Sequence, residues 1–165
     1  MIRQTIKDVE GFMREGTFFK GNLHSHTTNS DGNFTPEQAV EEFSKRGYSF
    51  LCMSDHDLYT NYSKELGKKD FLILPGLEMC LALVEADGNW IKVHHMNGIL
   101  GTTDMQKEAS KAPFSHKEKV GPFIYKENWD GAKEAEQKIK ELHDRGMFVT
   151  YNHPIWSRVE PHEIL

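Results

Sequence analysis

The sequence predicts a single α/β domain that spans residues 1–165. A chain of 165 residues fits one ordinary domain. Hydrophobic residues make up 38% and charged residues 27% of the chain, so one buried core is available. Short apolar runs alternate with amphipathic or polar segments, and this order favours a parallel sheet with right-handed crossovers, either open or closed into a barrel.

The apolar runs are short and rich in aromatic or β-branched residues, which is typical of buried strands. We therefore expect strands at residues 17–23, 48–53, 71–74, 90–93 and 147–151.

Two segments predict helices between some of these runs. The first begins after Thr35, which can cap it, with Pro36 in the first turn and Gln38 placed to complete a capping box. Gly47 ends this helix. The second covers about residues 130–145, where apolar side chains recur on one face and a glycine follows.

Three other segments carry weaker signals. Residues 58–69 are expected to form a shorter, polar helix. Residues 85–89 contain an Asp-Gly turn signal between two apolar runs and predict a hairpin. Residues 102–128 have no clear period, and we expect an irregular excursion there.

Charge and hydropathy exclude several classes of protein. The 20 basic and 25 acidic residues leave a net charge of −5, which favours neither nucleic acid nor an anionic membrane as a partner. The most apolar stretch, residues 71–86, is broken by proline, glycine and glutamate, so it cannot span a bilayer. With no signal-peptide run, and with Cys52 and Cys80 as the two cysteines, we expect a cytoplasmic protein.

The nine histidines are concentrated where the strand-like runs end. In a parallel α/β sheet, the carboxyl ends of the strands lie at one edge, so residues far apart in the sequence converge there. The side chains at these positions that can bind metal are His24, His26, His56, Glu78, His95 and His153.

The sequence His24-Ser25-His26 indicates a metal site because residues two apart on a strand point to the same face. Asp31 follows in a turn from which its carboxylate can return to the same point. An isolated pair of this kind would more often be two histidines that are exposed or hydrogen-bonded within the protein than a metal site. Here it accompanies four further candidates.

The remaining candidates are supported by their local sequence. His56 lies between Asp55 and Asp57, either of which could accept its second ring N–H. Glu78 would be a costly buried charge without a cation, and we expect it to bridge two metals. His94 and His95 point to opposite faces of a regular strand, and alternation alone does not choose between them.

The other histidines, His116, His143 and His162, are assigned to a loop, an exposed helix face and the tail, without a role. A nucleophile elbow, a phosphate loop and a dinucleotide fingerprint are absent from the sequence, so nucleophilic serine and nucleotide-binding chemistry lose support.

Taken together, the motifs resemble those of the PHP (polymerase and histidinol phosphatase) superfamily, in order and in rough spacing. The resemblance covers residues 20–154. It rests on Gly21-Asn22-Leu23-His24-Ser25-His26-Thr27, Ser30-Asp31-Gly32, Ser54-Asp55-His56-Asp57, Pro75-Gly76-Leu77-Glu78, His95-Met96-Asn97-Gly98 and Asn152-His153-Pro154.

The resemblance implies a distorted (β/α)7 barrel that holds two or three divalent ions, usually zinc, manganese or iron, and most characterised members hydrolyse phosphate esters. It favours His95 over His94. The metal roles that it implies fall on His24, His26, Asp31, His56, Glu78, His95 and His153.

One feature departs from the family pattern. Members of the family close the barrel with further strands and a late Asp-x-His motif. No aspartate follows Asp144 in this sequence, so that motif is missing. A barrel of this kind normally needs about 200 residues or more. We therefore expect an incomplete barrel, either the N-terminal part of a longer protein or a shortened form, whose exposed strand edge invites self-association.

The working hypothesis is a metal-dependent phosphoesterase that uses metal-activated water on a small phosphate ester. Glu78 and His153 are its expected catalytic residues. The alternatives are a metallo-amidohydrolase or lactonase with the same site, because the same chemistry attacks a carbonyl carbon, and a truncated, non-catalytic metal-binding module.

Overall fold

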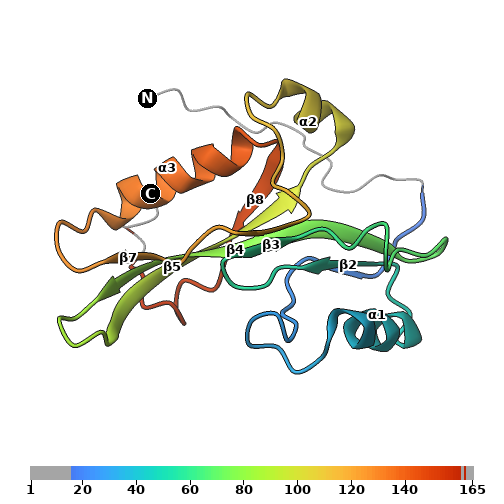
Figure 1. Cartoon of the computed structure of the whole chain (residues 1–165), viewed down its shortest axis with the longest axis horizontal. Helices are drawn as coiled ribbons and strands as arrows, with labels where there is room; N and C mark the ends of the chain where they lie inside the picture. The colour runs from blue at the N-terminus through green and yellow to red at the C-terminus, as the bar shows by residue number, and fades with distance from the viewer. Residues whose placement is uncertain (1–15, 161, 163–165) are drawn as a thin grey trace.

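The computed structural model describes residues 16–160 and residue 162, and its central feature is an eight-stranded mixed sheet (Figure 1). The elements, in chain order, are β1 (Gly21–Asn22), α1 (Pro36–Lys45), β2 (Phe50–Met53), β3 (Leu58–Thr60), β4 (Leu72–Val84), β5 (Trp90–Leu100), α2 (Thr103–Glu108), β6 (Lys117–Lys119), β7 (Phe123–Tyr125), α3 (Gly131–His143) and β8 (Met147–Tyr151).

The sheet combines a parallel part with an antiparallel part. Strands β1, β2 and β4 run parallel, as the sequence predicted. Strand β5 returns antiparallel to β4, and β8 is antiparallel to β5. The predicted parallel pairing therefore holds for β1, β2 and β4 but does not extend to β5 and β8, and the hairpin predicted at residues 85–89 is confirmed. The turn at these residues reverses the chain so that β4 and β5 form a long hairpin.

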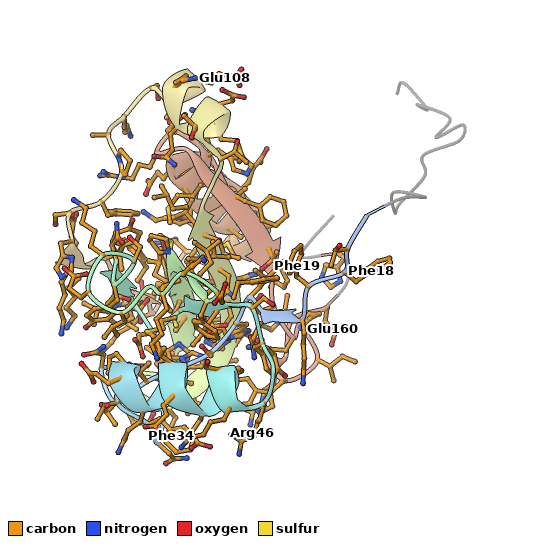
Figure 2. The ribbon with its side chains drawn as sticks, turned by 90° about the vertical axis from the view of Figure 1, so that its right-hand side faces the viewer. Phe18, Phe19, Phe34, Arg46, Glu108 and Glu160 are labelled. Atoms are coloured by element: carbon orange, nitrogen blue, oxygen red, sulfur yellow. The ribbon has the colours of Figure 1, made fainter. Side chains whose placement is uncertain are left out.

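Helix α1 forms where its sequence signals predict it. Thr35 caps the helix, its hydroxyl accepts from the Gln38 amide, and the Gln38 side chain accepts from the Thr35 amide. Gly47 follows the helix with a φ of 74°, which a residue without a side chain adopts at no steric cost. Figure 2 shows the helix between Phe34, just before its start, and Arg46 at its end.

Helices α1 and α3 cover two hydrophobic clusters. Helix α1 lies beside β2, and α3 lies along β8, β5 and β4 (Figure 1). The cluster under α1 contains Ala39, Val40, Leu51, Met53, Phe71 and Ile73. The cluster under α3 contains Tyr59, Leu77, Met79, Leu81, Met96, Ala135, Leu142 and Met147.

Strand β4 is buried on both faces, and its residues alternate between two environments. Leu77, Met79 and Leu81 belong to the cluster under α3. Glu78 and Cys80 alternate with them and therefore point to the opposite face. One face of β4 thus supplies the core, while the other carries a buried carboxylate.

Several element predictions are corrected by the structure. Residues 58–69 do not form a helix, because β3 pairs with β6 and turns follow it. The excursion at residues 102–128 contains α2, β6 and β7. Of the first predicted strand, 17–23, two residues are in β1. The runs at 71–74 and 90–93 are parts of much longer strands, since hairpin pairing extends both.

Among the described residues, no helix combines the length and the apolar character needed to cross a bilayer.

Candidate metal centre

The centre of the site is Glu78, a fully buried carboxylate in the middle of β4, with imidazoles on both sides. Oε1 of Glu78 lies 3.2 Å from Nε2 of His24 and 3.2 Å from Nε2 of His153. Oε2 lies 3.2 Å from Nε2 of His26 and 3.2 Å from Nδ1 of His56. Each carboxylate oxygen therefore faces two imidazole nitrogens.

The H-x-H pair follows β1, and both rings reach the same point. Their Nε2 atoms are 2.9 Å apart. Asp31 lies at the outer side of this pair, with Oδ1 3.4 Å from Nδ1 of His26 and Oδ2 3.6 Å from Nε2 of His56. The structure thus brings together the residues of the first motif, as their spacing predicts.

The hairpin of β4 and β5 separates His95 from His94. His95 pairs across the hairpin with Cys80 and lies on the face of Glu78. Its ring centroid is 5.0 Å from that of His153. His94 points to the other face, where Nδ1 is 2.6 Å from the Tyr151 hydroxyl. The structure therefore places His95 in the cluster and His94 outside it.

Not every candidate lies at the end of a strand. As expected, four of the candidates follow strands: His24, His26, His56 and His153. Glu78, however, lies inside β4, and His95 lies inside β5. The expectation of a single strand-end rim is wrong for these two. Hairpin pairing lengthens both strands past them, so they form the floor of the site.

Asp55 positions the loop that carries the first motif. Its Oδ1 accepts hydrogen bonds from the Thr27 amide (2.6 Å) and the Ser30 hydroxyl (2.9 Å), and Oδ2 accepts from the Thr27 hydroxyl (2.8 Å). Asp57 accepts from the Cys80 amide at 2.8 Å. Either carboxylate could have accepted a hydrogen bond from His56, but in the described part of the chain both bind neighbouring segments instead.

Two polar side chains support the cluster from behind. The Asn152 amide donates to Oε1 of Glu78 at 2.7 Å. The hydroxyl of Ser157 lies 3.2 Å from Nδ1 of His95 and 3.3 Å from Nδ1 of His153. A hydrogen bond at Nδ1 orients an imidazole and leaves Nε2 available to a metal.

Within residues 16–160 and 162, four groups of three side chains could each hold an ion, with donor atoms within 4.8 Å of one another. They share members, so the centre is one connected cluster. The groups are His24, His26 and Glu78; His26, Asp31 and His56; Glu78, His95 and His153; and His56, Cys80 and His95.

The cluster shifts the pKa values of its own members. Burial alone would raise the pKa of Glu78, but the imidazoles of His24 and His26 and the Asn152 amide hold it below its ordinary value. Burial would lower the pKa of His26, and Glu78 and Asp31 reverse this so that its pKa is raised. Burial lowers the pKa of His95 to about 4, which keeps this imidazole neutral.

The site opens into a cleft of about 430 Å³. Trp156 lies at its wall and is 71% exposed, with its ring stacked on His95 at a centroid distance of 5.8 Å. His153 has a positive φ of 24°, a costly backbone conformation that is characteristic of functional sites. The exposed side of the cluster is therefore accessible to a small molecule.

The residues present fit divalent metal ions. Oε2 of Glu78 is buried and accepts no hydrogen bond from the described residues, although two imidazole nitrogens approach it. A buried carboxylate oxygen without a hydrogen-bond donor is costly unless a cation satisfies it. Imidazole and carboxylate donors suit zinc, manganese and iron.

The histidines expected to have no role lie outside the cluster. His116 is exposed near Glu65, 3.8 Å away, His143 is exposed on α3, and His162 is exposed.

Sequence reasoning missed four supporting residues: Cys80, Asn152, Trp156 and Ser157. Strand alternation could have found the cysteine, because it follows Glu78 by two positions and shares its face. Asn152 belongs to the motif that contains His153, but its partner could not be read from the sequence. Ser157 and Trp156 reach the site through turns after β8, and no periodic signal marks them.

Comparison with known proteins gives a partial match. No protein-family model matches the chain. An alignment of 70 positions, which covers 39% of the chain, is 38% identical to the DNA polymerase/3'-5' exonuclease PolX of Bacillus subtilis (strain 168). The chain matches 12% of the length of that protein. This similarity hints at a relationship with PHP-type hydrolases.

Proposed function

We propose that the chain is a metal-dependent hydrolase of the PHP type and that its substrate is a small phosphate ester. One observation carries the proposal: both oxygens of the buried Glu78 carboxylate face pairs of imidazole nitrogens at 3.2 Å. A carboxylate placed in this way can bridge two ions, as carboxylates do in two-metal hydrolytic sites.

The residues of the cluster have distinct tasks in this proposal. Glu78 stays ionised because its pKa is lowered, so it offers one oxygen to each side. His95 stays neutral and can bind by Nε2, since Nδ1 faces Ser157. The side chain of His153 is 35% exposed and lines the cleft, where it would lie next to the substrate. Divalent ions held here would acidify a water molecule and neutralise charge on a phosphoryl group.

We propose two or three ions of zinc, manganese or iron. The three groups that consist of imidazoles and carboxylates support up to three positions, and Glu78 belongs to two of them. His26 also belongs to two groups, so the positions are close enough to act on one substrate.

We also propose that the sheet is part of a distorted (β/α)7 barrel of the PHP type. The parallel arrangement of β1, β2 and β4 supports this assignment, as does the convergence of the sequence motifs. Within the described residues, β1 pairs with β2 and β8 pairs with β5, which leaves one edge of each strand open.

A second substrate class is favoured by the comparison with PolX. The name of that protein includes a 3'-5' exonuclease, so a phosphodiester at the end of a nucleic acid is a candidate substrate. The net charge of −5 opposes it, because strong binding of a polyanion needs basic side chains. We rank the small phosphate ester first for this reason.

The test is a substrate panel with a matched variant. Metal-stripped chain is reconstituted with zinc, manganese or iron and assayed on p-nitrophenyl phosphate, single-stranded DNA, carboxylic esters, amides and lactones. We expect metal-dependent release of p-nitrophenol from the phosphate, lost in Glu78→Gln and retained in Glu136→Gln, whose side chain is exposed on α3.

The other outcomes overturn the proposal in defined ways. Cleavage of DNA alone selects the exonuclease, and cleavage of lactones or amides alone selects a metallo-amidohydrolase or lactonase. Tight metal binding with no turnover on any substrate selects a non-catalytic module. Activity that survives Glu78→Gln would place the chemistry outside this cluster.

A further inference from the structure

A buried thiol adjoins the cluster of imidazoles and carboxylates. Cys80 follows Glu78 by two positions on β4, so both side chains lie on one face of the strand. It is 2% exposed, and its Sγ is 3.2 Å from Nδ1 of His56. His95 lies directly opposite Cys80 across the hairpin.

These three side chains form a donor set of their own. The sulfur of Cys80 and one nitrogen each of His56 and His95 lie within 4.8 Å of one another. Two imidazoles and a thiolate are three of the four ligands of a tetrahedral zinc site, and they leave one position open. Sulfur ligands favour thiophilic ions over manganese and magnesium.

We propose that Cys80 is a metal ligand and that it makes one position of this centre selective for zinc or another thiophilic divalent ion. The inference rests on the metal centre of the proposed function. When the ion binds, the bond from sulfur to metal replaces the S–H bond, and the proton leaves to solvent.

The position of His56 links this site to its neighbour. Its Nδ1 faces Cys80, whereas its Nε2 faces Asp31 at 3.6 Å. A neutral imidazole has one unprotonated nitrogen, so His56 can serve one of these positions at a time. A thiophilic ion selects Nδ1 together with Cys80, and a hard ion selects Nε2 together with the carboxylate of Asp31.

Cys52 provides a matched control. It is also a buried, free cysteine, on the adjacent strand β2. Among the described residues it belongs to none of the candidate donor groups, and its Sγ lies close to the backbone at Gly76. A buried thiol without imidazole neighbours should not bind an ion.

The experiment uses cobalt as a spectroscopic substitute for zinc in the full chain. We expect Co²⁺ titration to produce a thiolate-to-cobalt charge-transfer band in the near ultraviolet. The band should persist in Cys52→Ala and disappear in Cys80→Ser. Zinc affinity, measured by competition with a chelating dye, should fall by ~10-fold or more in Cys80→Ser, while manganese affinity stays unchanged.

The failures are distinguishable. If cobalt binds tightly without a thiolate band, or if the band is lost in Cys52→Ala and kept in Cys80→Ser, Cys80 is no ligand and the proposed function stands. If the chain binds no cobalt, zinc or manganese, the metal centre fails and both proposals fall. Cys80 is the one cysteine that remains in Cys52→Ala. A thiolate band in that variant therefore identifies Cys80 as the ligand, even if Cys80→Ser does not fold.

Discussion

The side-chain amide of Asn152 donates a hydrogen bond of 2.7 Å to Oε1 of Glu78, a residue 74 positions away in the chain. The same amide donates to Oδ1 of Asn97 at 2.8 Å. Asn152 therefore fixes the rotamer of the carboxylate at the centre of the cluster from the end of β8. It holds Oε1 in place while leaving Oε2 free to accept an ion.

The first prediction concerns this support. Asn152→Ala removes a donor to Glu78, so the carboxylate gains freedom and its pKa rises toward the ordinary value. We expect metal affinity to fall about 10- to 100-fold, the usual effect of removing a partner that orients a ligand. Zinc competition titrations measure it, with Asn33→Ala as the control because Asn33 is exposed in a loop. Equal affinities in the two variants would show that Asn152 has no orienting role.

The second prediction concerns the loop held by Asp55. Asp55→Ala leaves the Thr27 amide and hydroxyl without their buried acceptor, so we expect a loss of about 3 kcal/mol in the free energy of unfolding. That corresponds to a fall in Tm of roughly 6–12 °C. Thermal and denaturant unfolding of metal-free protein check it, with exposed Asp70→Ala as the control. A loss as small as that of the control would contradict the assignment.

The third prediction concerns pH. Because Glu78 and Asp31 raise the pKa of His26 above its ordinary 6.5, its ring holds a proton at pH values where an ordinary histidine is neutral. A metal must displace that proton, so affinity should begin to weaken before the pH has fallen to 6.5. His95, with a pKa of about 4, adds no proton competition above that value.

Two measurements check the pH prediction. Metal titrations at a series of pH values should show affinity falling as pH falls. In metal-free protein, NMR titration should give a lower pKa for His26 in Glu78→Gln than in the wild type, because the neutral amide no longer favours the imidazolium. A His26 pKa that is unmoved by this substitution would disprove the electrostatic account.

The fourth prediction concerns association between copies of the chain. Strand β8 pairs with β5 along one edge, and Phe148 on this strand is 51% exposed. Unprotected strand edges pair with other chains. We expect concentration-dependent self-association in sedimentation velocity, weakened by Phe148→Lys. Phe34→Lys, which alters a phenylalanine of similar exposure (46%) before α1, should have no effect. A monomer at all concentrations would refute this expectation.

Local signals predicted helices α1 and α3, but they missed α2 and predicted a helix at 58–69 that does not form. They predicted the sheet only in part. Thr35, Gln38 and Gly47 act within a few residues of one another, so the sequence contains the whole of that interaction. The prediction of a helix at 58–69 was wrong because β3 forms by pairing with β6, more than 50 residues further along the chain. No local sequence pattern indicates such a distant partner.

That the candidate side chains lie together was easier to predict than the strands that carry them. Histidine and carboxylate at matching places in successive elements identify a cluster even where the strand boundaries are wrong. What the sequence could not provide was the packing of Ser157 and Asn152 against these side chains, because hydrogen bonds between distant segments depend on the finished fold.

The location of Glu78 within β4 determines how the proposed ions would enter and leave the cluster. Its strand is hydrogen-bonded on both sides, whereas His24, His26 and His153 lie on segments outside the strands. Backbone amides in the paired strand should exchange with solvent deuterium far more slowly than those of the segments above it. We therefore expect any ion bound by this cluster to exchange through movement of the segments that carry the imidazoles, with the carboxylate in place and without global unfolding.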